Sequence, residues 1–389
     1  MPWAIVAASC LGMFAATSTG STRAPFLPDM AQDLQVSLPA VANLFGVTAT
    51  AWGVSSWLVG LVSDRLGRKA FLIFSPLALA LAMLAISQAN SYGALLAFVV
   101  FGGCCCGAFT TTAMAEVSVQ ADPSMHGRAF GYVLSGQSLT LLFGVPMAAW
   151  FGSMTGWRGT HVALAVMATV AAFATFAALR GVQSRDATVA SEKRMSTRDA
   201  LTAPIKRLFV ALIAERMAFG LAAFYYASYL RTAYDLPIEA VALPLVGFAL
   251  GNIAGTLIGG QVADRFAYRR LSFAIAVSIA GFIAIPWFMW QPGLLPTTVT
   301  GITFAFFNAV ARPPLLAALA DVPKESRGIV MGLNSSIASV GWLAAALIGG
   351  WFYAGIGFVG FGPLMSLMCI ASALIVLPDS RMMKSTAVT

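Results

Sequence analysis

A short charged loop between two long apolar runs constrains this chain more than any other sequence feature. The loop at residues 60–69 reads GLVSDRLGRK, and a second copy at residues 260–269 reads GQVADRFAYR. Glycine, aspartate and arginine occupy the same places in both copies, although the second copy has Ala267 and Tyr268 where the first has Gly67 and Arg68. A duplicated charged loop in an apolar chain predicts two homologous membrane halves that share one plan.

The composition is that of a polytopic membrane protein. Of 389 residues, 59% are hydrophobic and only 10% are charged, whereas a soluble domain carries about 25% charged residues. At about 20 residues per crossing, the apolar runs account for about twelve transmembrane helices. The runs are continuous rather than alternating, which argues against a membrane β-barrel. We therefore expect an all-α membrane protein.

The net charge of +8 is explained by membrane topology. In a twelve-helix arrangement most lysines and arginines fall on one side of the membrane, and only Arg23, Arg158 and Arg231 fall on the other. This positive-inside asymmetry predicts that both termini lie in the cytoplasm, and we expect a protein of the bacterial inner membrane. We expect the lipid bilayer as a partner and no nucleic acid.

The apolar runs predict three parts of the chain. These are an N-terminal six-helix bundle at 1–180, a cytoplasmic linker at 181–206 and a C-terminal six-helix bundle at 207–389. The first bundle is expected to contain helices at about 3–22, 41–62, 70–89, 92–115, 129–152 and 160–180. The second is expected to contain helices at about 208–230, 240–262, 271–290, 296–320, 328–352 and 356–377.

The first loop closely matches the signature between helices 2 and 3 of the major facilitator superfamily, and the chain resembles that family over nearly all its length. The resemblance implies two six-helix bundles, related by an axis along the membrane normal, around one central cavity. It also implies that the loops form a cytoplasmic latch. Asp64 would face the start of helix 11 near Arg327, and Asp264 would face the start of helix 5 near Arg128.

The residue types in the loops suit such a latch. Gly60 and Gly260 lack side chains that would keep a neighbouring helix at a distance. Each aspartate follows about one turn later, where a carboxylate can face the positive N-terminus of a helix. Arg65, Arg68 and Arg265 complete the expected gating residues. Positive-inside charge alone is the simpler explanation, but it does not require glycine and aspartate at one spacing in both copies.

The end of helix 1 resembles a narrower group. Pro25 and Pro28, followed by Asp29, are similar to the helix 1 signature of the twelve-helix sugar- and drug-efflux branch, and prolines end a helix. Antiporters of that branch carry adjacent glycine and proline on helix 5, whereas one valine separates Gly144 from Pro146 here. The glycine and proline pattern on helix 5 therefore has two explanations: a role in export, or a kink that serves helix packing alone.

Charges within the apolar runs are candidate functional residues. Glu215 and Arg216 fall on helix 7 and Arg312 on helix 10, each at a depth of about 13 Å from the cytoplasmic edge at about 1.5 Å per residue. The family resemblance places both helices around the cavity, so we expect a Glu215–Arg312 ion pair. Three roles are open: a structural pair, proton coupling through Glu215, and direct contact of the arginines with substrate.

Other cavity-lining candidates follow from the resemblance, which implies that helices 1, 4, 7 and 10 line the cavity. Phe304, Asn308 and Arg312 recur every fourth residue and therefore share one helix face. Neutral hydroxyl groups and aromatic rings suit an amphiphilic solute. The candidates are Thr19, Thr111, Phe219, Tyr226, Phe304 and Asn308.

The sequence shows no phosphate-binding loop, catalytic triad or metal-ligand cluster, and its five cysteines lack metal spacing. We expect no enzyme activity, no cofactor and no bound metal. The predicted function is that of a monomeric secondary transporter, which works by alternating access and couples proton entry to export of a small organic molecule. Uptake or exchange of an organic anion, held by the intramembrane arginines, is the first alternative. A non-transporting sensor is the second.

Overall fold

The computed structural model describes residues 2–121, 126–180, 201–266, 268–321 and 324–377. Some side chains within these ranges lie outside the description, among them those of Asp64, Arg65, Arg128, Asp264 and Arg327. Most of the predicted linker at 181–206 also lies outside it. Every regular element in the described ranges is a helix, so the all-α prediction is confirmed.

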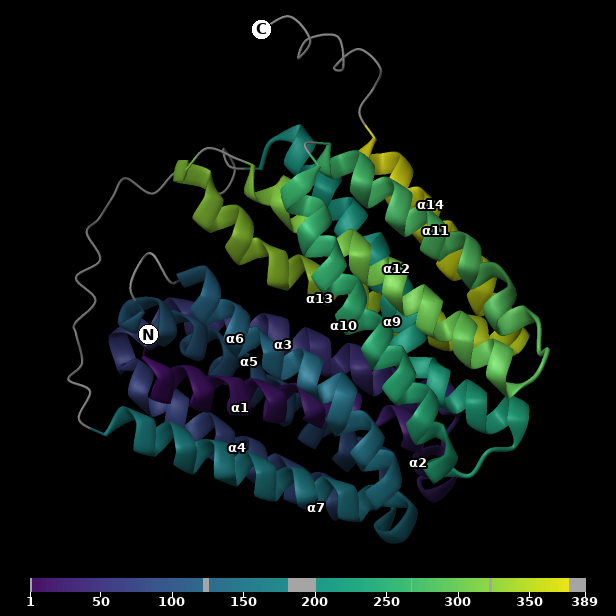
Figure 1. Ribbon diagram of the computed structural model, residues 1–389. Coiled ribbons are helices and arrows are strands. Elements are labelled where there is room, and N and C mark those ends of the chain that lie inside the picture. Colours follow the sequence, from purple (N-terminus) through teal and green to yellow (C-terminus); the bar gives the residue numbers. More distant parts are fainter. Residues whose placement is uncertain (1, 122–125, 181–200, 267, 322–323, 378–389) are drawn as a thin grey trace, which may run out of the picture. The chain divides into compact units, whose positions relative to one another are not determined.

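The helices follow the predicted apolar runs (Figure 1). In the first half they are α1 Trp3–Ser21, η1 Ala24–Phe26, α2 Leu27–Asp33, α3 Leu38–Leu66, α4 Arg68–Ser87, α5 Tyr92–Gln120, α6 His126–Leu139, η3 Thr140–Gly144 and α7 Val145–Leu179. In the second half they are α9 Ala203–Tyr234, η4 Ile238–Val241, α10 Ala242–Arg265, α11 Arg269–Met289, α12 Leu294–Ala320, α13 Lys324–Ile356, η5 Gly357–Gly360 and α14 Phe361–Val376.

Twelve membrane crossings can be assigned to these helices. Nine segments in the described ranges are long and apolar enough to cross a membrane. Two of them, Gly131–Leu179 and Ser336–Val376, have 49 and 41 residues, which suffices for two crossings each at about 20 residues per crossing. The first is kinked at Gly156, where φ is +69°, and the second is interrupted by η5. With α3, which has 29 residues, the predicted twelve-helix fold is reached.

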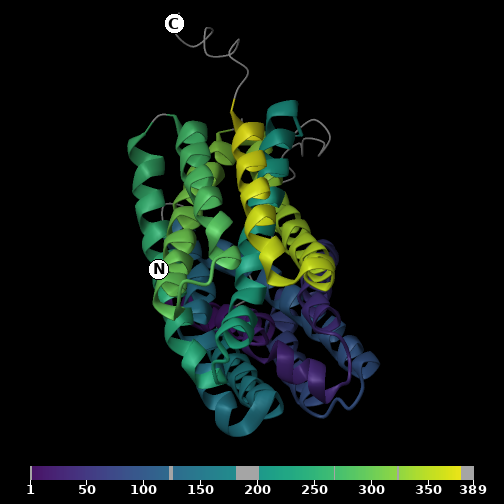
Figure 2. The same ribbon diagram turned by 90° about the vertical axis from the view of Figure 1, so that its right-hand side faces the viewer.

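The chain forms two compact units. The first comprises the described residues of 1–190 and 223–246, and the second those of 191–222 and 247–389. Helix α9 therefore contributes its beginning to the second unit and its end to the first. In the first unit α1 and α4 pack along α7, and in the second α11 packs against α12 and α14 (Figures 1 and 2). The division into bundles at 1–180 and 207–389 stays a prediction.

Both units contain a helix pair in close contact at a glycine. An added Cβ on Gly107 of α5 would lie 2.4 Å from the carbonyl oxygen of Trp52 on α3. An added Cβ on Gly255 of α10 would lie 2.2 Å from the carbonyl oxygen of Phe306 on α12. These are transmembrane helices 2 and 4 in one half and 8 and 10 in the other. The packing therefore agrees with the predicted duplication.

The fifth transmembrane helix contains a π-helical segment, η3, just before Pro146. Proline has no backbone N–H for the preceding turn, and π-segments often mark such interruptions and functional sites. Within the same unit this helix packs tightly on α1. An added Cβ on Gly136 would lie 2.4 Å from the carbonyl oxygen of Cys10, and one on Gly144 would lie 2.9 Å from the hydroxyl oxygen of Ser18.

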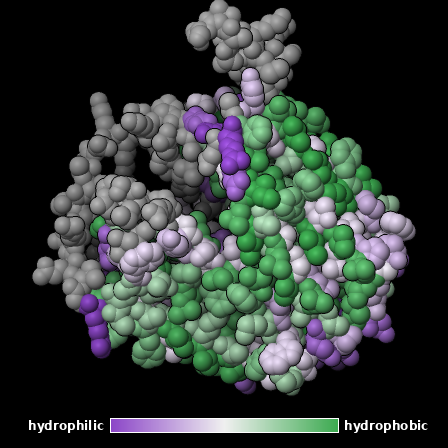
Figure 3. Space-filling model, viewed as in Figure 1, coloured by the Kyte–Doolittle hydropathy of each residue, from purple (hydrophilic) through white to green (hydrophobic). Residues whose placement is uncertain are grey.

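Large apolar side chains lie on the surface of the protein. Trp57, Phe74 and Trp351 are 64%, 66% and 73% exposed. The face in Figure 3 is largely hydrophobic, with hydrophilic side chains gathered in a few places. This distribution fits a protein that faces lipid. Arg23, Glu215 and Arg216 are in contrast buried, and such charges are the natural place to look for function.

Candidate functional site

A buried ion pair lies in the first part of α9. The side chain of Glu215 is 0% exposed and that of Arg216 is 4% exposed. Nε of Arg216 donates to Oε2 of Glu215 at 2.6 Å, and Nη2 donates to Oε1, so both carboxylate oxygens are engaged. This bidentate geometry is the strong form of the arginine–carboxylate interaction. The pair is therefore a fixed feature of this conformation.

The partner of Glu215 differs from the prediction. We expected Arg312, but Arg216 is the next residue on the same helix, and its long side chain reaches both carboxylate oxygens. The expected Glu215–Arg312 pair is therefore wrong for this structure. Arg312 is half-buried, and no carboxylate in the described part of the chain lies within ion-pair distance of its guanidinium.

Two aromatic rings lie beside the guanidinium of Arg216. Its carbon Cζ is 5.1 Å from the ring centroid of Phe219 and 6.0 Å from that of Trp342. Cation–π attraction at such distances adds to the ion pair. Helix α13 reaches this place because Gly341 has no side chain: an added Cβ there would lie 2.5 Å from Cβ of Arg216. The charge pair is thus enclosed from two helices of the second unit.

Buried rings continue from Phe219 through the second unit. Its ring centroid is 5.9 Å from that of Phe248 on α10, which is 6.2 Å from that of Trp287 on α11. Trp287 is in turn 5.2 Å from Phe304 on α12. Phe219 and Phe304 are 2% and 0% exposed. Both predicted residues therefore belong to the aromatic core of this unit in the present conformation.

Helix α12 carries the three predicted residues Phe304, Asn308 and Arg312 at four-residue spacing. Asn308 is 0% exposed, and neither its amide nitrogen nor its amide oxygen has a hydrogen-bond partner among the described residues. Leaving a buried polar group unpaired costs about 1–3 kcal/mol. Asn308 is therefore a buried group with unused capacity both to donate and to accept hydrogen bonds.

The remaining predicted binding residues lie in the first unit. Thr19 is 2% exposed, and its hydroxyl donates to the carbonyl oxygen of Ala16 at 2.7 Å. Thr111 is half-buried on α5. Tyr226 is 1% exposed, in the part of α9 that belongs to this unit. The second unit brings together the others, which are Glu215, Arg216, Phe219, Phe304, Asn308 and Arg312.

Arg23 is a buried charge that the sequence analysis assigned to an external loop. It is 2% exposed. Nε donates to the carbonyl oxygen of Thr19 at 3.1 Å, Nη1 to that of Leu44 at 3.4 Å, and Nη2 to the Thr48 hydroxyl at 2.9 Å. Arg23 therefore bonds the last turn of α1 and joins it to α3. The available signal was the run of serine and threonine before it, which offers acceptors in a membrane helix.

No atom in the described part of the chain makes a close contact with the two loop glycines. An added Cβ on Gly60 would lie 3.8 Å from Cγ2 of Thr111, an ordinary distance, and one on Gly260 would meet no described atom within 4 Å. The expected close approach of a helix to these glycines stays a prediction, because the helix starts near Arg128 and Arg327 lie largely outside the described part of the chain. The side chains of the two latch aspartates, of Arg65, and of Arg128 and Arg327, which the latch was expected to involve, lie outside the described part of the chain.

Other charges near the loops bond within their own unit. Arg68 donates to the carbonyl oxygen of Ala115 at 3.4 Å, near the end of α5. Arg269 forms an ion pair with Asp321 at 2.6 Å, at the end of α12. Arg265 is exposed. Each loop is thus tied to the corresponding helix of its half, α5 in the first and α12 in the second.

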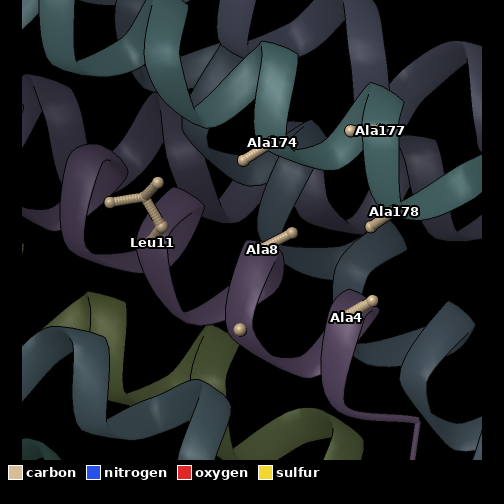
Figure 4. A pocket seen from close by; sticks show the side chains of 7 residues that line it. Ala4, Ala8, Leu11, Ala174, Ala177 and Ala178 are labelled. Atoms are coloured by element: carbon tan, nitrogen blue, oxygen red, sulfur yellow. The ribbon is translucent and has the colours of Figure 1, made fainter.

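A surface groove of about 400 Å³ lies between α1 and α7 in the first unit (Figure 4). It is lined by six alanines and Leu11. The groove has no charged or hydrogen-bonding side chain and contains none of the candidate residues. It is therefore a poor candidate for a solute site, which requires a few fixed polar groups.

All-helical membrane proteins with charges buried between their helices include the membrane transport proteins, in which such charges are often functional. The sequence matches the family model of the Major Facilitator Superfamily over residues 9–291, with a second match over residues 208–387. The chain belongs to this superfamily. Its members are transporters and not enzymes.

Several characterised relatives are efflux proteins. The chain is 27% identical to a chloramphenicol resistance protein of Streptomyces lividans, over 84% of either chain. It is 24% identical to the purine ribonucleoside efflux pump NepI of Escherichia coli, over 92% of this chain and 89% of the relative.

Solved structures agree on the fold. A bacterial homologue of the human lysosomal transporter Spinster aligns over 96% of this chain and 94% of its own, with a TM-score of 0.72 at 14% identity. The human organic anion transporter MFSD10 aligns over 97% of this chain and 99% of its own, with a TM-score of 0.68 at 16% identity.

Proposed function

We propose that this transporter exports a small organic molecule across the bacterial inner membrane by alternating access, driven by protons that enter in exchange. The observation that carries the proposal is the buried Glu215–Arg216 pair on a membrane-spanning helix. Glu215 is a carboxylate that can take up and release a proton inside the protein. The efflux relatives support the outward direction.

The coupling follows from the energetics of the pair. Protonation of Glu215 removes the negative charge that Arg216 faces, and a buried cation without its partner is strongly unfavourable. The protonated protein therefore favours a conformation in which Arg216 finds water or another partner. Release of the proton favours the paired conformation again. The proton thus binds the two conformations with different affinity, which is what coupling requires.

The substrate class is proposed from the side chains around the buried pair and on α12. Arg216 lies against Phe219 and Trp342, and Asn308 has a free donor and a free acceptor in the same unit. Aromatic rings together with an amide group suit an uncharged molecule that has a flat ring and several polar groups. Chloramphenicol and purine ribonucleosides, which name two relatives, have this character and are the first compounds to test.

The two charged loops are proposed to close the cytoplasmic side. Asp64 and Asp264 would each face a helix N-terminus of the opposite half when that side is shut. No described atom crowds Gly60 or Gly260 in the present structure, which is compatible with the approach of a helix in another conformation. Asp64→Asn should then lower transport while the amount of protein in the membrane stays the same. Unchanged flux in the reconstituted variant would remove the latch from the proposal.

The test of coupling is flux in proteoliposomes with and without a pH gradient, with radiolabelled chloramphenicol and a purine ribonucleoside as probes. Glu215→Gln should abolish gradient-driven movement and leave exchange of the probe intact. Glu239→Gln is the matched control, because it changes an exposed acid in η4 just beyond the end of α9. Normal gradient-driven flux in a folded Glu215→Gln protein would show that the carboxylate is structural.

Arg312 supports a second candidate function, transport of an organic anion. Glu215 is occupied by Arg216, so Arg312 remains a half-buried cation that no described carboxylate neutralises. A carboxylate of a substrate could take that place. Competition distinguishes the candidates: anionic aromatic acids should displace a bound probe if the second holds, whereas cationic dyes and uncharged aromatics should do so if the first holds.

A further inference from the structure

The last part of α9 is bound to α2, the short helix that follows α1 and η1, by a second ion pair. Nη2 of Arg231 donates to Oδ1 of Asp29 at 2.9 Å, and Nη1 donates to Oδ2. Nη1 also donates to the carbonyl oxygen of Pro25 at 2.8 Å. Arg231 thereby bonds both the backbone at Pro25 and the carboxylate of Asp29. All these residues belong to the first unit.

The same face of α9 makes two further contacts nearer its middle. The ring of Phe224 stacks on that of Phe45 in α3, with centroids 4.0 Å apart and planes 3° from parallel. The hydroxyl of Ser228 donates to the carbonyl oxygen of Ala24 at 3.4 Å. Positions 224, 228 and 231 lie on one helix face. A continuous strip of α9 is therefore attached to η1, α2 and α3.

We propose that this strip is the outer gate of the transporter, closed in the present conformation. Asp29 and Arg231 lie at the membrane edge that the positive-inside rule assigns to the outside. By sequence α9 is the first helix of the second half, yet its end packs with the first half. The gate must separate before a solute can leave on that side. This inference rests on membership of a transporter family and not on proton coupling.

The position of the gate also links it to the buried charge pair. Glu215 and Arg231 are on one continuous helix, and the interval between them corresponds to about 24 Å at about 1.5 Å per residue. The beginning of α9 belongs to the second unit and its end to the first. A change at Glu215 that displaces α9 therefore acts directly on the strip that closes the gate.

A second ion pair on the same side supplies a matched control. Arg158 donates from Nη1 to Oδ2 of Asp33 at 2.6 Å, and the Trp157 ring nitrogen Nε1 donates to the same oxygen at 2.8 Å. Asp33 is one turn from Asp29, and both ion pairs are partly exposed. In this case, however, both partners belong to the first half of the sequence. The pair should stay closed when the halves separate.

The test measures how often the strip opens, without any substrate. Ser228→Cys, in a protein whose five native cysteines are replaced, places a thiol at a position that is 0% exposed. Its rate of reaction with a maleimide is measured on purified protein in detergent, where the reagent reaches both sides. Asp29→Asn and Arg231→Gln should each raise the rate about fivefold, as expected for loss of a partly exposed ion pair.

Three comparisons decide the result. Asp33→Asn and Arg158→Gln should leave the labelling rate unchanged, and the exchanged pair Asp29→Arg with Arg231→Asp should return it toward the parent value. If the Arg231 variant does not fold, Asp29→Asn carries the test, because it keeps the bond of Arg231 to Pro25. An unchanged rate in both gate variants, or an equal rise in the control variants, overturns the proposal.

Discussion

The two units each bury an arginine near the first helix of a half, and they stabilise it by different means. Arg216 in α9 is paired with an adjacent carboxylate and lies against two rings. Arg23, just after α1, is bonded to two carbonyl oxygens and one hydroxyl, and no described carboxylate lies within ion-pair distance of it. The two positions are thus equally buried and differ in their charge balance.

This difference bears on which of the two arginines has surroundings that change charge when a proton binds. The dipoles around Arg23 have no protonation change at ordinary pH, so its environment is constant. It holds the end of α1 against α3 and acts as a structural joint. The environment of Arg216 changes charge whenever Glu215 gains or loses a proton. Among the described residues, the one fully buried ion pair lies in the second unit, and it is the pair on which the proposed coupling to a pH gradient depends.

The largest predicted effect comes from removal of the carboxylate charge of Glu215. Glu215→Gln leaves Arg216 buried without a counter-charge, which should lower the free energy of unfolding by about 3 kcal/mol, since loss of one member of a buried pair costs about 3–5 kcal/mol and glutamine keeps one acceptor. Thermal unfolding in detergent measures it. An unchanged unfolding temperature would mean that the pair does not stabilise Arg216.

Removing both charges should reverse that loss. Glu215→Leu combined with Arg216→Met leaves no buried charge, and such apolar replacements are often neutral or stabilising by about 1–4 kcal/mol. We expect the double variant to unfold at or above the parent temperature and to lose gradient-driven transport. A double variant that is less stable than Glu215→Gln alone would show that the pair is required for folding.

The sequence predicted the helices well because apolar runs of membrane length have few alternative structures. It predicted the partners of charged residues poorly. Arg23 was assigned to a loop because only the packing of α1 on α3 brings Leu44 and Thr48 to it. Glu215 was paired with Arg312 because of their matching depth and the family resemblance that places both helices around the cavity, whereas the rotamer of Arg216 decides the contact. The close helix contacts at Gly107 and Gly255 were not predicted, because they depend on which helices are neighbours.

Arg23→Met should have a smaller effect than Glu215→Gln. It leaves the carbonyl oxygen of Thr19 without its bond, whereas Thr48 keeps a hydrogen bond to the carbonyl oxygen of Leu44 at 2.8 Å. Only neutral groups lose a partner, which costs about 1–2 kcal/mol. The unfolding temperature should fall, while the pH dependence of transport should stay as in the parent. A changed pH dependence would contradict a purely structural Arg23.

The smallest predicted effect concerns a buried group that is polar but uncharged. Asn308→Leu replaces an amide without described partners by an apolar side chain of similar size, and it should raise the free energy of unfolding by about 1 kcal/mol. The same variant should weaken transport of uncharged aromatic probes, because it removes the donor and acceptor proposed to bind them. Ser372→Ala is the control, since its buried hydroxyl already donates to Ala211 at 2.7 Å and its loss should destabilise the protein without changing selectivity. A more stable Asn308→Leu protein that transports normally would remove Asn308 from the binding site, and a less stable one would show that the amide is satisfied by ordered water.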